Sequence, residues 1–544
     1  MGLTGGRGEA VGADQGPNAA AGVAVAQGSD GAASPDPAMG LIGATGPPDA
    51  PGTSDTTSVP PPTPHPHSTS SPGVFEMLKI GVGPSSSHTL GPWLAARRFV
   101  DLLSQAGQLS EVAHLQVDLY GSLALTGKGH GTDRALILGL LGADPVTVPL
   151  EYVAQGPENV RLSGVLLLGG MVSVPFDAKK DLVFHKDSVL PGHPNGMQFR
   201  AQDGRGAVLL ESTAYSIGGG FVVFEGDSPN AQPRPVPFDV STGAKLLSIC
   251  QAQGLSIADI ARQNELASID EHHLSEGLKT IWQVMEDSVH RGCLSTGQLP
   301  GGLEVFRRAS DLVRRTTGQE VVADRDRWFS SLRPPEGSME FSRILTLVGA
   351  FALAVSEENA AFGRIVTAPT NGSAGVLPAV LLYYRLFSGR SVGPRELENF
   401  LLVAALIGGI FKTGATISAA MGGCQAEIGV SSAMAAAALT EGLGGNPEQT
   451  VMAAEIAMEH HLGLTCDPIG GLVQIPCIER NTMGAVKAIT AAYLALQSET
   501  ARAKVSLDAV VKTLWDTAMD MNTRYKETSL GGLAVNVAVN IPEC

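Results

Sequence analysis

The stretch Ser431-Ser-Ala-Met-Ala-Ala-Ala-Ala-Leu439 consists almost wholly of small residues and carries no charge. Alanine is the strongest helix former, and small side chains allow neighbouring helices to approach closely. The surrounding sequence, from about Thr242 to Tyr525, is also rich in Ala, Gly and Leu and has few strand signals. This composition predicts a compact, mostly α-helical domain, which we place at residues 246–544.

The sequence upstream of this domain has a different pattern. Some segments alternate or run apolar with β-branched residues, which is typical of strands, and others have helical periodicity. The predicted strands are 115–120, 165–168, 208–213 and 221–224, and the predicted helices are 91–105 and 132–141. This mixture predicts an α/β domain at residues 73–226.

Two further segments have compositions that do not predict a packed core. Residues 1–72 are dominated by Gly, Ala, Pro, Ser and Thr, so they are predicted to form a disordered tail. Arg7 is the only Lys or Arg before Lys79, which argues against a transit peptide. Residues 227–245 begin with a proline-rich polar stretch and are predicted to be a linker.

Composition also limits the class of function. The formal net charge of −16 disfavours nucleic acid and anionic membranes as partners, because both attract basic surfaces. Six cysteines in 544 residues are too few for a disulfide-stapled fold, which indicates a reducing, cytoplasmic location. The apolar runs 344–355 and 400–411 are shorter than the roughly 20 residues that span a bilayer, so we interpret them as buried helices. A small-molecule substrate fits these properties best.

Three cysteines lie beside helix-breaking residues. Cys424 follows two glycines, Cys466 precedes Asp-Pro, and Cys477 follows a proline. Thiols on such short, rigid segments can converge on one metal site. Their spacing lacks the compact Cys-x-x-Cys runs of ferredoxins, so spacing alone leaves buried structural cysteines as the simpler interpretation. Cys250 and Cys293 lie in ordinary helical contexts and are predicted to be core residues.

Several short motifs occur in order along both predicted domains. They are Gly83-Pro-Ser-Ser-Ser-His-Thr89, Gly127-Lys-Gly-His-Gly-Thr132, His193-Pro-Asn-Gly196, Tyr215-Ser-Ile-Gly-Gly-Gly220, Ala368-Pro-Thr-Asn-Gly372, Lys412-Thr-Gly414, Glu479-Arg-Asn481 and Lys526-Glu-Thr-Ser529. With the three cysteine contexts, they make the chain closely resemble the iron-sulfur L-serine dehydratases. The resemblance extends over nearly everything except the tail and the linker.

The resemblance implies a single-chain form in which a β-like domain, similar to allosteric substrate-binding folds, is fused to a helical catalytic domain. It implies a 4Fe-4S cluster, L-serine as substrate and a homodimer. The family's cluster cysteines fall on Cys424, Cys466 and Cys477. The family's chain-terminal cysteine falls on Cys544, which would occupy the fourth iron until substrate displaces it.

The elimination reaction that this resemblance implies requires a base near the Cα proton, and histidine is the usual residue type. We predict His130 as the base, because its flanking glycines let the backbone approach the site closely. His88, His193 and Lys412 are predicted to orient or polarise the substrate. The predicted substrate-binding residues are Ser85, Ser86, Ser87, Thr132, Asn195 and Asn371. Without the resemblance, a core or loop residue is the favoured interpretation of each histidine.

Two alternatives stay open on sequence grounds. In a pyridoxal-phosphate dehydratase, Lys412 would form the Schiff base and Ser216-Ile-Gly-Gly-Gly220 would cradle the phosphate. In a non-catalytic iron-sulfur redox or sensor module, the cysteines would bind a cluster without releasing ammonia from serine.

Overall fold

The computed structural model describes residues 71–227, 234, 236–333, 339–528 and 530–537, all of which belong to one compact unit, residues 61–544. The predicted tail lies outside the described residues except for Ser71 and Pro72, and so does most of the proline-rich part of the linker. Cys544 also lies outside them.

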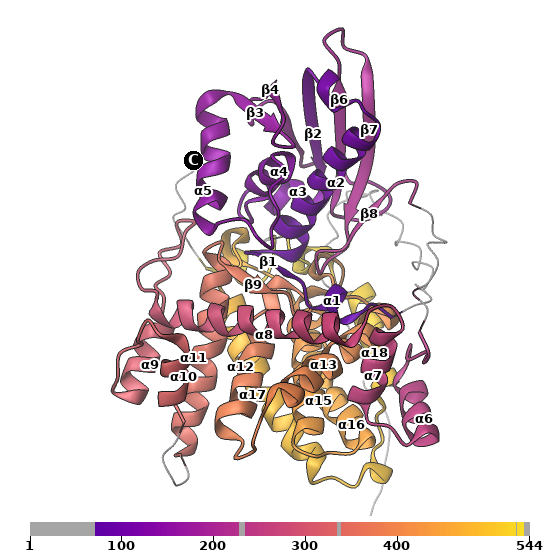
Figure 1. Cartoon of the computed structure of the whole chain (residues 1–544), viewed down its shortest axis with the longest axis vertical. Coiled ribbons are helices and arrows are strands. Elements are labelled where there is room, and N and C mark those ends of the chain that lie inside the picture. The colour runs from indigo at the N-terminus through magenta and orange to yellow at the C-terminus, as the bar shows by residue number, and fades with distance from the viewer. Residues whose placement is uncertain (1–70, 228–233, 235, 334–338, 529, 538–544) are drawn as a thin grey trace, which may run out of the picture. The chain divides into compact units, whose positions relative to one another are not determined.

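An antiparallel-rich sheet forms the centre of the region between Gly91 and Phe224, which we call the α/β part (Figure 1). Its strand order is β5-β2-β6-β7-β8, and only the β2–β5 pair is parallel. A two-stranded sheet, β3–β4, lies beside it. The strands are β2 (His114–Tyr120), β3 (Val165–Leu168), β4 (Val172–Pro175), β5 (Leu182–His185), β6 (Gly196–Gln202), β7 (Val208–Ser216) and β8 (Val222–Phe224).

The helices of the α/β part pack on the sheet because their apolar residues face it. The helices are α2 (Gly91–Gln105), α3 (Gly121–Thr126), α4 (Thr132–Leu140) and α5 (Leu150–Ser163). Phe99 of α2 stacks on Phe199 of β6, with ring centroids 5.1 Å apart, in a core shared with Leu136 of α4. The predicted helices 91–105 and 132–141 correspond to α2 and α4.

The sequence prediction identified β2, β3, β7 and β8 but missed β4, β5 and β6. β4 and β5 have only four residues each, too few to display a period. β6 begins inside His193-Pro-Asn-Gly196, whose composition is typical of a turn.

The start of the described chain packs with the helices that follow the α/β part. Helix α1 (Val74–Met77) contributes to their core, and β1 (Ile80–Val82) pairs antiparallel with β9 (Arg364–Val366). Both segments fall inside the predicted α/β domain in sequence. The π-helix η1 (Ser86–Leu90) then leads directly into α2. Because β1 pairs with β9 and α2 belongs to the α/β part, the Pro84–Thr89 motif that joins them lies between the two parts.

The remaining helices form what we call the helical part, as predicted. They are α6 (Gly243–Gln253), α7 (Ile257–Leu266), α8 (Glu271–Leu294), α9 (Ala309–Thr317), α10 (Arg325–Ser331), α11 (Phe341–Ala360), α12 (Val376–Phe387), α13 (Pro394–Gly414), α14 (Ala419–Gly422), α15 (Ile428–Gly442), α16 (Pro447–Glu459), α17 (Cys477–Leu496), α18 (Leu507–Asp520) and α19 (Leu533–Asn536). Short helical turns occur between the helices of this part: η3 (Asn371–Ser373), η4 (Gly423–Ala426), η5 (Ile469–Gly471), η6 (Thr500–Arg502) and η7 (Thr523–Tyr525). One further turn, η2 (Leu109–Glu111), lies in the α/β part.

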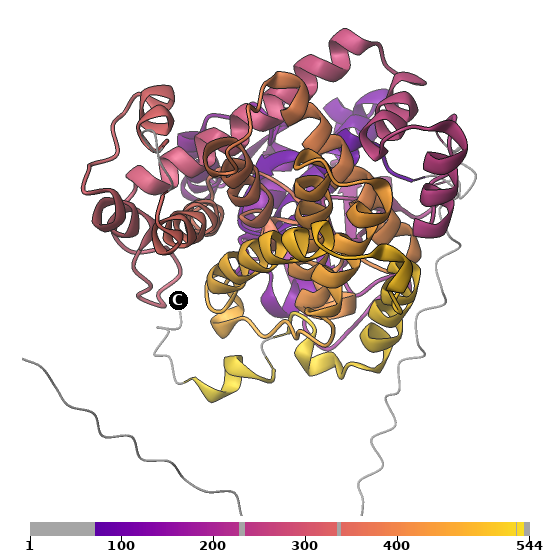
Figure 2. The same ribbon diagram turned by 90° about the horizontal axis from the view of Figure 1, so that it is seen from below.

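Helix α15 contains the alanine-rich stretch and is the centre of the helical part. All of its residues from Ile428 to Thr440 are buried, and it contacts α12, α13, α16 and α17. The long α8 crosses the front of these helices in Figure 1 and runs along their edge in Figure 2. Small side chains allow this close packing. At Gly442, for example, an added side chain would come within 2.9 Å of the Tyr384 ring.

Among the described residues, one helix, α13, is long and apolar enough to cross a membrane by length and composition alone. Most of its apolar stretch is buried inside the protein. The apolar runs 344–355 and 400–411 therefore lie in core helices, α11 and α13, as predicted.

Candidate active site

The three predicted cluster cysteines are all buried and come from short rigid segments. Cys424 lies in η4, Cys466 lies in the loop after α16, and Cys477 is the first residue of α17. Gly423 has φ of +71°, and a side chain there would come within 2.8 Å of the Leu464 carbonyl. The glycine therefore permits the close approach of the two loops that carry Cys424 and Cys466.

The Cys424 and Cys466 thiols and the Glu427 carboxylate form a group with metal-ligand spacing. Their ligand atoms all lie within 4.8 Å of one another. Cys477 is outside this tightest group. Burial, and then the charge of Cys424, raises the pKa of the Cys477 thiol well above its usual value, so the charge of one thiol acts on the other.

Arg480 is the positive charge of this site. Its guanidinium donates to Cys424 Sγ at 3.2 Å, to the Thr465 carbonyl at 2.6 Å and to Asp467 Oδ1 at 2.9 Å. A hydrogen bond from Cys466, together with Arg480, lowers the pKa of the Cys424 thiol to about 7. A thiolate beside a guanidinium is the form of cysteine that binds metals.

Glu427 is buried beside these thiols. Burial, followed by the charge of Cys424, raises its pKa to about 8, and a hydrogen bond from Thr370 opposes the rise. A side chain at Gly372 would lie 2.7 Å from Glu427 Oε2. The glycine therefore lets the Asn371 loop close over this carboxyl group.

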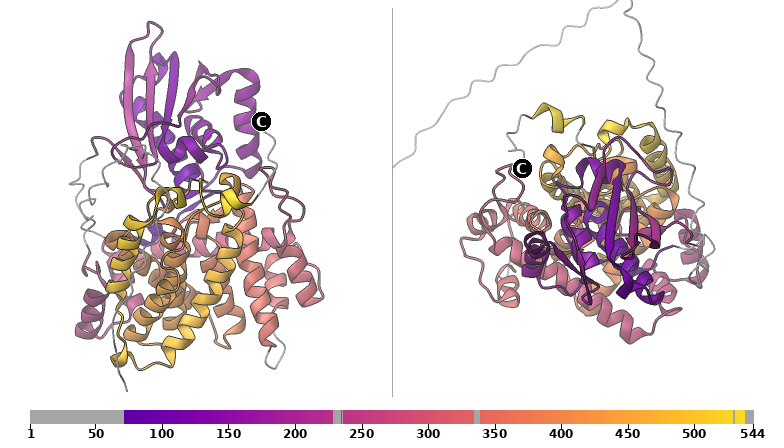
Figure 3. Two further views of the ribbon diagram at one scale, coloured as in Figure 1. Left: turned by 180° about the vertical axis from the view of Figure 1, so that it is seen from behind. Right: turned by 90° about the horizontal axis from the view of Figure 1, so that it is seen from above.

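The segment Tyr525–Glu527 connects the cysteines to the predicted catalytic histidines. Cys466 N–H donates to the Tyr525 carbonyl at 2.8 Å, and Glu527 N–H donates to the Cys466 carbonyl at 2.9 Å. The Glu527 carboxyl then points away from the cysteine backbone, with Oε1 3.4 Å from His88 Nδ1 and 4.0 Å from His130 Nε2. Figure 3 (left) shows this C-terminal region, in yellow, at the level where the α/β part meets the helices.

His130 is held in one tautomer by the backbone. Its Nδ1 lies 2.9 Å from the Thr126 carbonyl, which only accepts, so Nδ1 carries the proton and Nε2 presents its lone pair towards Glu527. Burial lowers the pKa of His130 to about 4, so the ring is neutral near pH 7. A neutral imidazole that carries its lone pair on Nε2 can accept a proton there.

His88 is the partner of His130 in this site, with ring centroids 4.6 Å apart. Its Nδ1 lies 2.9 Å from Ser87 Oγ, and its Nε2 lies 3.0 Å from Ser122 Oγ. Burial, and then the charge of His130, lowers the pKa of His88 well below its usual value. Both ring nitrogens of His88 are therefore engaged by hydroxyls.

The predicted hydroxyl residues surround this pair. Ser85 caps η1 by accepting from His88 N–H at 3.1 Å, and Ser87 Oγ lies 3.4 Å from Glu527 Oε1. Thr132, the first residue of α4, donates to the His88 carbonyl at 2.5 Å. Ser86 is buried in the same turn. Ser85 is therefore the N-terminal cap of η1.

His193 and Asn195 lie in a loop against the start of α3. His193 Nδ1 accepts from Asn195 N–H at 3.1 Å, and the Pro194 carbonyl between them accepts from Ser122 N–H at 2.9 Å, which holds the loop against α3. The Asn195 amide donates to the Ser216 carbonyl at 3.2 Å. Asn371, the first residue of η3, donates to the Val82 carbonyl at 3.2 Å and so ties the η3 loop to β1.

Lys412 is not brought to the cysteine–histidine group by any of its described interactions. Its Nζ lies 4.1 Å from the centroid of Phe221, a ring that Lys79 also contacts. Burial lowers the pKa of Lys412, and Glu76 opposes that shift. The ammonium group therefore belongs to a separate lysine–phenylalanine cluster where α13 meets the β7–β8 loop.

Several residues of this site were not predicted: Ser122, Glu427, Asp467, Arg480 and Glu527. Arg480 and Glu527 lie inside motifs quoted above, Glu479-Arg-Asn481 and Lys526-Glu-Thr-Ser529, and Glu427 follows Cys424 by three residues. The motifs were a usable signal. Nothing in the local sequence of Ser122 distinguishes it.

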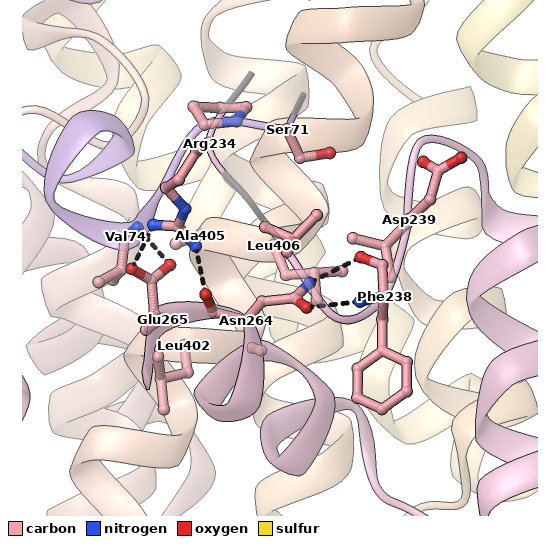
Figure 4. A pocket seen from close by; sticks show the side chains of 14 residues that line it. Ser71, Val74, Arg234, Phe238, Asp239, Asn264, Glu265, Leu402, Ala405 and Leu406 are labelled. Atoms are coloured by element: carbon pink, nitrogen blue, oxygen red, sulfur yellow. Dashed lines mark hydrogen bonds and ion pairs between the residues drawn. The ribbon is translucent and has the colours of Figure 1, made fainter. Parts of the chain in front are cut away.

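A separate pocket lies between the end of the linker, α7 and α13 (Figure 4). Arg234 bonds Glu265 at 2.7 Å, and the Asn264 side chain exchanges two hydrogen bonds of 3.0 Å with the Phe238 backbone. These bonds fasten the predicted linker, at Arg234 and Phe238, onto α7. None of the residues that line the pocket belongs to the cysteine–histidine group.

Comparisons with known proteins agree with this division of the chain. Residues 73–227 match the family described as "Serine dehydratase beta chain", and residues 252–534 match "Serine dehydratase alpha chain". The chain is 47% identical over 467 residues to L-serine dehydratase TdcG of Escherichia coli (strain K12), which covers 85% of this chain and 98% of that protein. It is 48% identical over 468 residues to the L-serine dehydratase of Streptomyces coelicolor, with 85% and 98% covered. The Helicobacter pylori L-serine dehydratase is 42% identical over 475 residues, with 85% and 98% covered.

Proposed function

The chain belongs to the serine dehydratase family, with the beta and alpha regions fused in one polypeptide, and from this premise we propose that it converts L-serine to pyruvate and ammonia. One structural observation carries the proposal most directly. Glu527 joins the thiol group and the histidine pair, since its backbone bonds Cys466 and its carboxyl lies beside His88 and His130. Thiols for a metal centre and a neutral imidazole are thus neighbours in one buried site.

We propose that Cys424, Cys466 and Cys477 hold a 4Fe-4S cluster. The donor set fits such a group, because two buried thiols already have ligand spacing, the charge of Cys424 acts on a third, and Arg480 donates to a sulfur. Held by three thiolates, the cluster would keep one metal position open and supply a Lewis acid for the substrate hydroxyl. Cys544 stays a proposal as the reversible occupant of that position, because it lies outside the described residues.

His130 is the proposed base for the Cα proton. Its Nδ1–H is fixed on the Thr126 carbonyl, so the proton would be taken at Nε2, and the imidazolium could share its charge with Glu527. His88, held by Ser87 and Ser122, is the proposed orienting group. The aminoacrylate product would tautomerise and hydrolyse without help from the protein.

The other proposed contacts are less directly supported. Ser85, Ser86, Ser87 and Thr132 surround the histidine pair and would bind the substrate carboxylate, with His193, Asn195 and Asn371 in the loops beside them. A direct role of Lys412 has no support in its described contacts. The proposed homodimer, cytoplasmic location, allosteric-type fold of residues 73–226 and absence of nucleic-acid and membrane partners rest on sequence and resemblance.

The pyridoxal-phosphate alternative is not favoured. Gly218, Gly219 and Gly220 all have positive φ, and side chains there would meet Ser418, Ile417 and Leu90. These glycines therefore serve the packing of the β7–β8 loop on the helical part. Lys412 contacts Phe221 in the same loop rather than facing an open site.

The decisive experiment is anaerobic purification followed by iron and sulfide analysis and a pyruvate assay with L-serine. We expect iron, sulfide, a broad absorption band that air bleaches, and ammonia release. Iron-free protein with a borohydride-trappable band would support the pyridoxal enzyme. Iron-loaded protein that releases no ammonia from serine or threonine would support the redox or sensor module.

A further inference from the structure

Glu527 has an unusual backbone and an unusual degree of burial. Its φ is +59°, a left-handed conformation that non-glycine residues seldom adopt, and its side chain is buried. Four contacts fix this position: the bond from Glu527 N–H to the Cys466 carbonyl, the bond from Cys466 N–H to the nearby Tyr525 carbonyl, a bond from Ser122 Oγ to the Glu527 carbonyl at 3.2 Å, and Ser87 Oγ at Glu527 Oε1. Strained residues of this kind persist where the surrounding structure holds them, often at functional sites.

The two carboxyl oxygens of Glu527 have different surroundings. Oε1 faces Ser87, His88 and His130. Oε2 is buried and has no hydrogen-bond partner within the part of the chain that the structure describes. Buried acidic groups are normally paired with a cation or fully hydrogen-bonded. The side chain therefore presents an acceptor for which the described protein supplies no donor.

The neighbouring histidines do not supply a cation either. Burial lowers the pKa of both His88 and His130, so both rings are neutral near pH 7. No lysine or arginine among the described residues forms an ion pair with Glu527, whereas Asp467 is paired with Arg480 at 2.9 Å. A ligand cation placed at Oε2 would complete the site.

L-serine, the substrate of the proposed function, carries such a cation. Its ammonium is attached to the same carbon as the proton that His130 is proposed to take, so the acceptor for the ammonium must lie next to His130 Nε2. Glu527 Oε1 is 4.0 Å from that atom. We propose that Glu527 receives the ammonium group of the amino-acid substrate through Oε2 and thereby sets the enzyme's preference for 2-amino acids over 2-hydroxy acids.

Glu427, the other carboxyl beside the thiols that has no arginine partner among the described residues, is a weaker candidate. It lies within 4.8 Å of both the Cys424 and Cys466 sulfurs and accepts a hydrogen bond from Thr370. Its ligand atom lies among the proposed metal ligands. Burial, and then the charges of Glu427 and Cys424, raise the pKa of Glu527 as well, but Glu527 Oε1 also lies 4.0 Å from Nε2 of the proposed base.

Two ligands without a β leaving group isolate the ammonium contact. L-alanine and L-lactate differ only in carrying an ammonium or a hydroxyl at Cα, so their binding to the iron-loaded, full-length enzyme can be measured by anaerobic calorimetry without turnover. Because a hydrogen bond to a charged group contributes about tenfold to a hundredfold in affinity, we expect Glu527→Gln to weaken L-alanine binding by about that factor and to leave L-lactate nearly unchanged. Glu455→Gln, a buried carboxyl on α16, is the matched control and should keep the wild-type preference.

The outcomes separate this inference from the proposed function. A Glu527→Gln enzyme with normal iron content and an unchanged preference for L-alanine would overturn the assignment of Glu527. If that variant fails to fold or load iron, Glu527→Asp, which retains the charge on a shorter side chain, should weaken L-alanine more than L-lactate; an equal loss for both ligands would overturn the assignment. Wild-type enzyme that forms no pyruvate from L-serine would instead refute the proposed function.

Discussion

Replacing Arg480 tests whether the cysteine site depends on one guanidinium, whose side chain is 15% exposed. Arg480 lies in the first turn of α17 and donates to Cys424 Sγ, the Thr465 carbonyl and Asp467, whose side chain is only 5% exposed. Its neighbour in sequence, Glu479, forms a pair of similar length with Arg308, but those two side chains are 41% and 43% exposed. Two adjacent residues of one helix thus offer a buried and an exposed ion pair for comparison.

The expected magnitudes follow from this difference in exposure. Removing one partner of a buried pair leaves an uncompensated charge and destabilises by about 3–5 kcal/mol. An exposed pair contributes about 0–1 kcal/mol, because water solvates both ions. Arg480→Ala should therefore lower the free energy of unfolding by at least about 2 kcal/mol more than Glu479→Ala. Arg480→Lys should recover only part of the loss, since a single ammonium cannot reproduce the planar fork of donors.

Urea unfolding of metal-free protein, followed by circular dichroism, gives the stability difference without a contribution from bound iron. The iron content of anaerobically loaded protein then reports on the site itself, and we expect Arg480→Ala to reduce it while Glu479→Ala retains it. Equal destabilisation by Arg480→Ala and Glu479→Ala, or full iron content in Arg480→Ala, would show that Arg480 does not organise the cysteines.

Three further predictions address the base, the thiols and pH. His130→Ala should abolish exchange of the substrate Cα proton with solvent while keeping iron; exchange at the wild-type rate would exclude His130 as the base. Cys466→Ser should lose most of the iron whereas the core substitution Cys250→Ser should retain it, and equal iron content in both would argue against the proposed ligand. Burial lowers the pKa of Lys79 to about 7 from its ordinary 10.5, so the unfolded chain binds this proton more tightly. Stability should therefore rise with pH between about 7 and 10.5 through this residue. Lys79→Met should flatten that rise in unfolding midpoints measured across the range, and an unchanged slope would contradict the interpretation.

The division into two regions was predictable from local patterns, but part of the sheet was not. The alanine-rich stretch predicted a mostly helical domain, and α15, which contains it, is buried from Ile428 to Thr440. The strands β5 and β6 were not predicted, because β5 is too short to display a period and β6 starts in a turn-like sequence. Both form strands by pairing with β2, which is distant in sequence. Likewise, β1 pairs with β9, a partner almost 300 residues away, and α1 packs in the core of the helical part. Local periodicity carries no information about such partners.

For the site, the sequence by itself determined which residue types were present: three thiols beside Gly or Pro, three histidines in short motifs, and the motifs that indicate the family. Only the tertiary structure showed that Lys526 pairs with Cys466 and so brings the Glu527 carboxyl to His88 and His130, while Lys412 contacts Phe221 instead. The physical reason is that a side chain's chemistry depends on burial and on the charges around it. Those surroundings come from segments distant in sequence, which meet only when the chain has folded.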